Sequence, residues 1–251
     1  MGVILGEQVL EEVGTIQAKI AGTWLPAAER LLEIGCSTGY LTRHFLGRAQ
    51  RTFGLDVNEA ALRARRRPHQ RIPLVCADVE SLPFMDRSFD AIVMLEVIEH
   101  TRADTLASAE VRRILKVGGT LVLSTPHAGA FAFLDPYNVR RAIQRRLPRV
   151  YCVAERLVRF QSGQFTDNLE RHRHYRLEEL VALLGPDFAI RAVYRGGLLL
   201  YPVVAAAISV VGRLSNKTGI LRWLYRLLNW DSRCRFGRLS YNVMILAERI
   251  Q

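Results

Sequence analysis

The segment "RLLEIGCSTGYLTRHF", residues 30–45, places a short apolar run directly before three small residues, Gly35, Ser37 and Gly39. An apolar run of this length is typical of a buried strand. Small residues at every second position let a ligand come close to the backbone, which a simple turn does not require. The segment therefore predicts a strand that ends in a ligand-binding loop.

Strand-length apolar runs alternate with helical patterns from this segment to residue 126. The expected strands are 31–34, 51–57, 72–78, 89–95 and 120–126, then 188–194 and 239–249. The expected helices are 7–24, the segment after Gly39, the segment capped by Asn58, 103–116 ended by Gly118 and Gly119, and 175–185. This alternation predicts a parallel sheet wrapped by helices, whose ligand binds beyond the carboxyl ends of the strands.

Three acidic residues stand at the ends of the first three expected strands: Glu33, Asp56 and Asp78. A pyrophosphate of a dinucleotide would be repelled by Glu33, which precedes the first glycine by two residues, whereas a cationic ligand would be attracted. Asp56 is placed to accept hydrogen bonds from ribose hydroxyls, and Asp78 from an adenine amino group. The three acids therefore predict a site for a cationic adenosine without phosphate, and S-adenosylmethionine fits that description.

Four segments resemble, in order and spacing, the motifs of class I S-adenosylmethionine-dependent methyltransferases. They are "LLEIGCSTGYLT", "GLDVN", "CADVESLPFMDRSFDAIVMLEVIEH" and "LKVGGTLVLSTP". Ser37 departs from the family pattern, which has a glycine there. The resemblance implies an α/β fold with a Rossmann-like seven-stranded sheet. That sheet is mostly parallel, has helices on both faces and ends in an antiparallel strand, and the fold forms one methyltransferase domain over residues 1–251.

The resemblance also implies the residues that hold the cofactor. They are Glu33, Gly35, Cys36, Ser37 and Gly39 for the methionine part, Asp56 and Val57 for the ribose, Asp78 and Val79 for the adenine, and Leu95 and Glu96 for the floor. An alternative for Asp56 and Asp78 is that each carboxylate caps the turn after its strand.

Three histidines follow expected strands or precede a helix, where they could serve a methyl acceptor. Methyl transfer from a sulfonium is an in-line displacement, and a hydroxyl acceptor must lose its proton to a base. We predict that the catalytic residues are His100, His127 and His174. His172 is a further candidate. The alternative for each histidine is a hydrogen bond that orders its loop.

The pattern Glu96-x-x-Glu99-His100, with a later histidine, resembles the metal site of small-RNA 2′-O-methyltransferases and of some quinone O-methyltransferases. Carboxylates and imidazoles in that arrangement suit a divalent cation. The same pattern also occurs in family members that use no metal, and we predict no metal site here.

The chain has a formal net charge of +11, almost all of it from arginine, since lysine occurs only at positions 19, 116 and 217. Such a charge favours an anionic partner, whether nucleic acid, a membrane surface or a substrate, although a genome-wide preference for arginine is an equal explanation. Four cysteines without a CxxC pair suit a reducing cytoplasm. The N-terminal residues do not resemble a secretory signal.

Two segments interrupt the alternation, and they bear on the acceptor. Residues 127–170 are predicted to form an acceptor lid, with seven arginines against two acids over 131–160. Residues 196–238 form a hydrophobic and basic insertion, in which an uncharged run precedes Trp223 and Trp230 among arginines. Aromatic residues flanked by arginine suit a membrane interface. We therefore predict O-methylation of a hydrophobic or lipid-linked small molecule at the inner membrane face. The alternatives are an RNA methyltransferase or a non-catalytic cofactor-binding scaffold.

Overall fold

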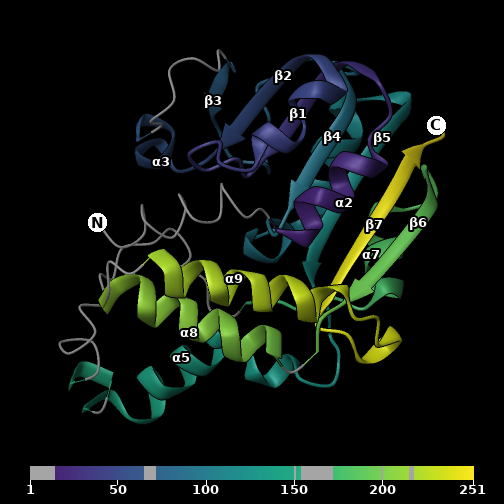
Figure 1. Ribbon diagram of the computed structural model, residues 1–251. Helices are drawn as coiled ribbons and strands as arrows, with labels where there is room; N and C mark the ends of the chain where they lie inside the picture. The colour runs from purple at the N-terminus through teal and green to yellow at the C-terminus, as the bar shows by residue number, and fades with distance from the viewer. Residues whose placement is uncertain (1–14, 65–71, 150, 154–171, 199, 215–217) are drawn as a thin grey trace. The chain divides into compact units, whose positions relative to one another are not determined.

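The seven-stranded sheet has the order β3-β2-β1-β4-β5-β7-β6 (Figure 1). The computed structural model describes residues 15–64, 72–149, 151–153, 172–198, 200–214 and 218–251. The strands are β1 (Ala28–Ile34), β2 (Ala49–Asp56), β3 (Leu74–Cys76), β4 (Phe89–Leu95), β5 (Leu115–Pro126), β6 (Phe188–Gly196) and β7 (Asn242–Arg249). The first five strands pair in parallel, and β7 runs against them. The predicted Rossmann-like sheet with an antiparallel last strand is confirmed.

The helices of the described residues fall between and after these strands. They are α2 (Ile16–Trp24), α3 (Glu59–Arg63), α4 (Asp104–Ile114), α5 (Pro136–Arg146), α7 (Leu177–Leu184), α8 (Leu200–Leu214) and α9 (Thr218–Arg233). Short 3₁₀ turns are η1 (Thr42–His44), η2 (Leu46–Arg48), η3 (Ile98–His100), η4 (Ala132–Leu134) and η6 (Gly237–Leu239). The expected helix over 7–24 is described only from Ile16 onward, and its first part lies outside the described residues.

The described residues form two compact units. The sheet unit comprises Gln17–Pro126, Tyr175–Tyr194 and Val243–Gln251. The helical unit takes its described residues from Met1–Ile16, His127–His174 and Arg195–Asn242. The segments 127–170 and 196–238, which interrupt the alternation, thus contribute to the helical unit. Within the predicted acceptor lid, residues 150 and 154–170 lie outside the described residues.

The apolar strands form the core of the sheet unit because each is buried on both faces. Leu32, Ile34, Ile92 and Met94 pack on one side of the sheet, whereas Leu31 and other residues pack on the opposite side. In parallel strands that helices cover on both faces, consecutive residues are apolar, whereas apolar and polar residues alternate in a strand with one exposed face. This is why "LLEI" and "AIVML" give a clear strand signal.

The expected helix after Gly39 is wrong. Residues 40–48 instead form turns and the two 3₁₀ segments η1 and η2. The connection from the end of β1 to the start of its parallel neighbour β2 comprises residues 35–48, and these residues form turns and short 3₁₀ segments and not an α-helix.

Two element boundaries also differ from expectation. The helix expected to end at Gly118 ends at Ile114, and β5 begins at Leu115. Gly118, with φ of +77°, lies where the pairing of β5 with β4 shifts register, so the glycine serves an irregularity in the strand and not a helix end. The third strand is shorter than expected and ends at Cys76, two residues before Asp78. The predicted cap is confirmed, since Asn58 accepts a hydrogen bond from the Ala61 amide.

In the helical unit, α8 and α9 lie side by side and enclose an apolar cluster around Val204, Leu224 and Leu228. Asp231 of α9 is buried and accepts hydrogen bonds from the Leu198 and Tyr201 amides at the start of α8. The helices α8 and α9 thus stand between β6 and β7 in the chain, within the segment 196–238 that the sequence marks as an insertion. Among the described residues, no helix has the length and hydropathy that crossing a bilayer requires.

Candidate functional site

The loop after β1 adopts a conformation that favours glycine. Gly35 and Gly39 both have φ of +78°, and Ser37 has φ of +50°. The amides of Gly35 and Cys36 both donate to the Leu55 carbonyl, at 2.7 Å and 3.0 Å. A Cβ on Gly35 would lie 2.3 Å from Cγ2 of Val97. Close packing and a left-handed backbone therefore both require glycine at position 35.

Asp56 fixes this loop from the end of β2. Its Oδ2 accepts a hydrogen bond from the Ser37 amide at 2.7 Å, and its Oδ1 accepts one from the Asn58 amide at 2.8 Å. The capping alternative for Asp56 is thus observed. A carboxylate has about four lone-pair positions, so the same group retains capacity to accept from ribose hydroxyls. Val57, the next residue, is exposed.

Asp78 caps the turn after β3 in the same way. Its Oδ1 accepts from the Glu80 amide at 3.0 Å, and its carbonyl accepts from the Ser81 amide. Val79 beside it is buried in the core of the sheet unit. The side chain therefore organises the loop that is expected to face adenine.

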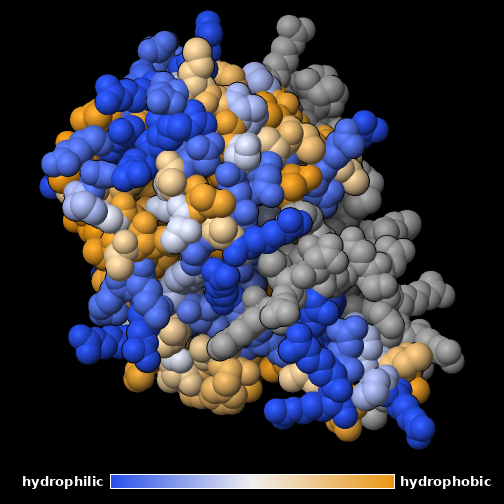
Figure 2. Space-filling model, turned by 180° about the vertical axis from the view of Figure 1, so that it is seen from behind, coloured by the Kyte–Doolittle hydropathy of each residue, from blue (hydrophilic) through white to orange (hydrophobic). Residues whose placement is uncertain are grey.

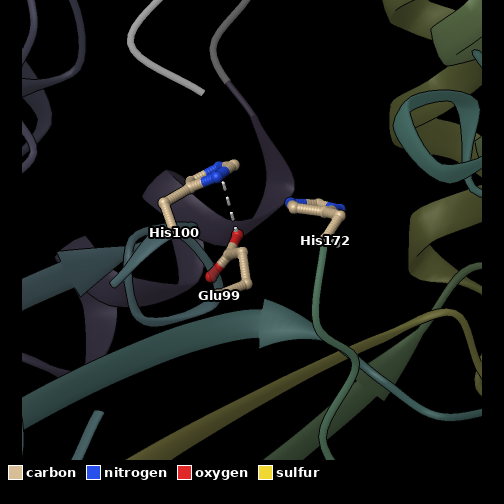
Figure 3. Close-up of side chains that lie close together, drawn as sticks. All are labelled: Glu99, His100 and His172. Carbon is tan, nitrogen blue, oxygen red and sulfur yellow. Dashed lines mark ion pairs between the residues drawn. The ribbon is translucent and has the colours of Figure 1, made fainter. Parts of the chain in front are cut away.

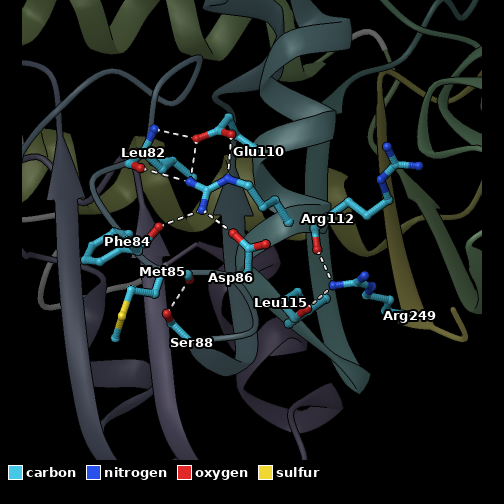
Figure 4. A network of polar contacts seen from close by, with 10 residues as sticks. Leu82, Phe84, Met85, Asp86, Ser88, Glu110, Arg112, Leu115 and Arg249 are labelled. Atoms are coloured by element: carbon cyan, nitrogen blue, oxygen red, sulfur yellow. Dashed lines mark hydrogen bonds and ion pairs between the residues drawn. The ribbon is translucent and has the colours of Figure 1, made fainter.

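Arg113 of α4 holds the continuation of this loop. Its partners Leu82, Phe84, Asp86 and Glu110 are labelled in Figure 4. Its guanidinium donates to the carbonyls of Leu82 and Phe84 and to the carboxylates of Asp86 and Glu110, at 2.7–3.0 Å. The hydrogen bonds that Arg113 donates to Glu110 and Asp86 raise the pKa of Arg113. No sequence pattern predicts this role, because an arginine on a helix surface is usually solvated.

Glu33 is a buried carboxyl at the end of β1. It is 4% exposed and accepts a short hydrogen bond from the Thr42 hydroxyl. Burial raises the pKa of Glu33 to about 8, the Thr42 hydrogen bond opposes this, and the charge of Asp56 adds to it. Among the described residues, no cationic side chain forms an ion pair with Glu33. A buried acid without a cation suits a ligand that brings its own positive charge.

Glu96 and Glu99 follow β4, and each accepts a hydrogen bond from a hydroxyl of β5. Glu96, with φ of +55°, accepts from Ser124 at 2.7 Å, and Glu99, which is 1% exposed, accepts from Thr125 at 2.9 Å. The other oxygen of Glu99 lies 3.9 Å from Nε2 of His100 (Figure 3). Leu95, the last residue of β4, is half-buried. A buried carboxylate thus stands beside the imidazole of His100 within the sheet unit.

His127 belongs to the helical unit, where it orders the chain. It is buried, its amide donates to the Tyr241 carbonyl at 2.6 Å, and its Nδ1 lies 3.0 Å from the Ser240 carbonyl. This geometry matches the loop-ordering alternative. The catalytic role of His127 stays a prediction without support from its contacts.

Asp135 joins two other histidines in the helical unit. Its Oδ2 accepts from the Tyr241 hydroxyl at 2.7 Å and lies 3.0 Å from Nδ1 of His172 and 3.4 Å from Nε2 of His174. Burial acts to raise the pKa of Asp135, but hydrogen bonds from His172, His174 and Tyr241 outweigh it and hold the pKa well below its usual range. No sequence pattern predicts the pairing of Asp135 with Tyr241, because 106 positions of the chain separate them.

Comparison with known proteins agrees with this geometry, since residues 32–123 match the model of a methyltransferase domain family. Residues 32–123 form a methyltransferase domain of the class I S-adenosylmethionine-dependent type. S-adenosylmethionine is the cofactor that the names of similar proteins give, and it is the group against which the site is compared. The residues of the domain fit that group: Glu33 suits a cationic amino acid part, Gly35 permits close approach to the backbone, and Asp56 has acceptor capacity for a ribose.

Named relatives support the same domain. The chain is 32% identical over 119 residues to a protein of Mycolicibacterium smegmatis named as an S-adenosylmethionine-dependent methyltransferase, covering 45% of this chain and 46% of that one. It is 30% identical over 129 residues to a ubiquinone biosynthesis O-methyltransferase of Pseudomonas aeruginosa, covering 49% and 55%. The chain thus spans about half the length of these relatives. The crystal structure of the YcgJ protein of Bacillus subtilis has the same fold, with a TM-score of 0.58 and 16% identity over 94% of this chain and 98% of that one.

We predict that Gly35→Ala abolishes cofactor binding. The added Cβ would meet Val97 and would also strain the left-handed backbone, so the loop must move. Isothermal titration calorimetry with S-adenosylhomocysteine measures the effect. Gly47→Ala is the matched control, because Gly47 has open space around it. Adding Val97→Ala to Gly35→Ala should restore part of the affinity. Unchanged affinity in Gly35→Ala alone would contradict this account of the loop.

We also predict that affinity for S-adenosylmethionine rises with pH by up to about ten-fold per unit between about pH 6 and pH 7.5. The pKa of Glu33 is raised to about 8, so the ligand-free carboxyl is largely protonated in this window and must lose a proton to face an ammonium group. Calorimetry in two buffers of different ionisation enthalpy should detect that proton release. Glu33→Gln should flatten the pH dependence.

The same raised pKa has a consequence for stability. The folded state holds the proton of Glu33 more tightly than the unfolded state, so the stabilising contribution is complete below about pH 4.5 and is lost as the pH rises through about 8. Glu33→Gln should therefore stabilise the ligand-free protein at high pH. A pH-independent affinity in the wild-type protein would contradict the pairing of Glu33 with the ligand.

Proposed function

We propose that the protein transfers a methyl group to a hydroxyl of a hydrophobic or lipid-linked small molecule while it is bound to the anionic inner face of a membrane. The observation that carries this proposal is the outer face of α9, where two tryptophans are exposed among arginines. The methyltransferase domain supplies the reaction class. The O-methyltransferase name of the Pseudomonas aeruginosa relative supports oxygen as the atom methylated.

The cofactor supplies a methyl group on a sulfonium, which an oxygen nucleophile displaces in line. Within the sheet unit, His100 is the group best placed to remove the hydroxyl proton. The carboxylate of Glu99, 3.9 Å away and almost fully buried, orients the imidazole and stabilises its protonated form. Thr125 fixes that carboxylate from β5. The acceptor proton thus moves to His100 as the carbon–oxygen bond forms.

The exposed face of α9 suits a membrane interface. Ile220, Trp223 and Trp230 lie at helical spacing and are 43%, 61% and 59% exposed. Arg222 and Arg226 are exposed beside them, whereas Asp231, the acid of this helix, is buried and caps α8. Tryptophan rings insert at the boundary of headgroups and acyl chains, and arginine attracts anionic lipid. The described charged residues of α9 that are exposed beside this apolar face are arginines, which favours an anionic bilayer.

An RNA methyltransferase is the second candidate function, because exposed arginines on α5 and α9 also suit a phosphate backbone. The apolar character of the α9 face favours lipid over RNA. The product of the reaction separates the two candidates.

The experiment that tests the function is transfer of tritium from methyl-labelled S-adenosylmethionine to a total cell extract, followed by solvent partition. Label in the organic phase is expected with the wild-type protein. His100→Gln should lose most of this transfer while keeping its affinity for S-adenosylhomocysteine. Label in a nuclease-sensitive aqueous fraction would overturn the proposal in favour of RNA, and no transfer from a protein that binds the cofactor would favour a scaffold.

We further predict that Trp223→Ser with Trp230→Ser releases the protein from vesicles of phosphatidylglycerol and phosphatidylcholine. Both side chains are mostly exposed, so the variant should keep its melting temperature within a few degrees. Vesicle co-sedimentation measures the effect. The control is Leu147→Ser with Val153→Ser, which also removes two exposed apolar side chains but lies outside α9. Equal sedimentation of both double variants would count against α9 as the membrane-binding face.

A further inference from the structure

The helical unit contains a cavity of about 470 Å³ beside α5 that has no role in the proposal above. Its lining includes Phe133, Arg141, Ala142, Arg145, Arg146 and His174. A cavity of this size holds a small ligand or the headgroup of a larger one. Three guanidinium groups on one wall and an aromatic ring on another suggest a ligand that is both anionic and apolar.

One face of α5 supplies the cationic wall. Asn138, Arg141, Ala142 and Arg145 follow one another at intervals of three and four residues, which places them on the same side of the helix. Arg141 is half-buried, lies 5.6 Å from the centre of the Tyr137 ring and donates to Gln144. Arg141 is thus held in place before any ligand arrives.

The segment that forms this part of the cavity is basic, and its acid is buried. From Ala128 to Arg149 the chain has five arginines and a single acid, Asp135. Asp135 is 2% exposed, and its two oxygens accept from the Asn138 amide and from the Tyr241 hydroxyl. The surface over α5 is mainly hydrophilic in Figure 2 (lower right). Within Ala128–Arg149, the carboxylate is therefore bound by Asn138 and Tyr241, and no described contact joins it to the arginines of the cavity wall.

His174 is fixed on the wall by the same buried carboxylate. Its Nε2 lies 3.4 Å from Asp135, and its ring meets the Tyr241 ring edge-on with centroids 5.9 Å apart. The Asn138 side chain exchanges two hydrogen bonds with the backbone of His172, at 2.9 Å and 3.0 Å. These contacts tie the segment that carries His174 to α5. The His174 side of the cavity is thus joined to α5, while Arg145 and Arg146 are exposed on that helix.

We propose that this cavity binds a phosphate group of the methyl acceptor, with Arg141, Arg145 and Arg146 as its ligands. Phe133 then contacts the carbon chain that bears the phosphate. Guanidinium groups match phosphate oxygens in paired hydrogen bonds, and three of them suit a doubly charged anion better than a carboxylate. The inference rests on the proposed function, because it names the chemical class of the acceptor.

The chain attaches this segment at one edge of the sheet. The segment leaves β5 after Pro126 and rejoins the sheet unit at Tyr175, whose amide donates to the Pro126 carbonyl at 3.0 Å. The polypeptide that carries α5 and His174 therefore begins and ends at the carboxyl end of β5.

The test is calorimetric titration of the full chain with three probes: dioctanoyl phosphatidic acid below its critical micelle concentration, inorganic phosphate and octanoate. The lipid phosphate is expected to bind tightest. Arg145→Gln with Arg146→Gln should raise its Kd about ten-fold or more, because charge-assisted hydrogen bonds are lost. The matched control is Arg140→Gln with Arg149→Gln, which removes the same charge outside the cavity and should change Kd less than about two-fold.

A second variant tests the cavity without changing its charge. Ala142→Phe fills the space from an exposed helix position, so folding should be retained and the Kd of the lipid phosphate should rise. Equal binding of octanoate would overturn the choice of phosphate, and equal binding of inorganic phosphate would overturn the lipid source. Polyuridylate binding that depends on Arg145 and Arg146, without binding of the lipid phosphate, would overturn the proposal in favour of RNA.

Failure of this inference is distinguishable from failure of the proposed function. Binding of the lipid phosphate with loss in the arginine variant, but no labelled product in the organic phase, would support the phosphate site and contradict the methyl-transfer proposal. Labelled product in the organic phase, with no effect of the arginine variant on the Kd of the lipid phosphate, would support the methyl-transfer proposal and contradict the phosphate site. Affinity for S-adenosylhomocysteine, measured in each variant, confirms that the sheet unit remains folded.

Discussion

The contact between Gly35 and Val97 is the constraint on which the cofactor site depends. The chain must leave β1 in a left-handed conformation while the side chain that follows β4 packs within van der Waals distance. Any Cβ at position 35 would separate these two strand ends. Because β1 and β4 are neighbours in the sheet, that separation would also disturb Glu33 and Glu96, which stand on either side of the loop. A single glycine thus couples the sheet to the site.

The acids at the ends of the first three strands have two different roles, one in shaping turns and one in binding a ligand. Asp56 and Asp78 accept backbone amides and shape their turns, whereas Glu33 lacks a cation among the described residues and has a raised pKa. In Asp56 and Asp78, backbone amide donors stabilise the negative charge of the carboxylate. In Glu33, which is buried and has a hydroxyl donor, the negative charge is stabilised when a cationic ligand binds. The same residue type at three strand ends therefore has two roles.

The helical unit follows a related principle with its two inward-facing acids. Asp135 caps α5 and Asp231 caps α8, and both are buried. Each carboxylate stabilises the amide end of a helix, and neither neutralises the arginines outside. The outer surfaces of α5 and α9 are therefore cationic, which is the physical basis for proposing an anionic acceptor and an anionic membrane.

Local patterns in the sequence predict the sheet, which the structure confirms, and they also predict the cofactor residues: the patterns are apolar runs of strand length, small residues in register, and acids at strand ends. The local pattern was wrong for residues 40–48, where turns and 3₁₀ segments replace the expected helix, and at Gly118, where a glycine pair lies in an irregular strand and not at a helix end. Only the tertiary structure brought Asp135, His172, His174 and Tyr241 together and turned one face of α5 into a cavity wall. Those contacts join residues far apart in the chain, and no local spacing encodes which distant side chain will satisfy a buried carboxylate.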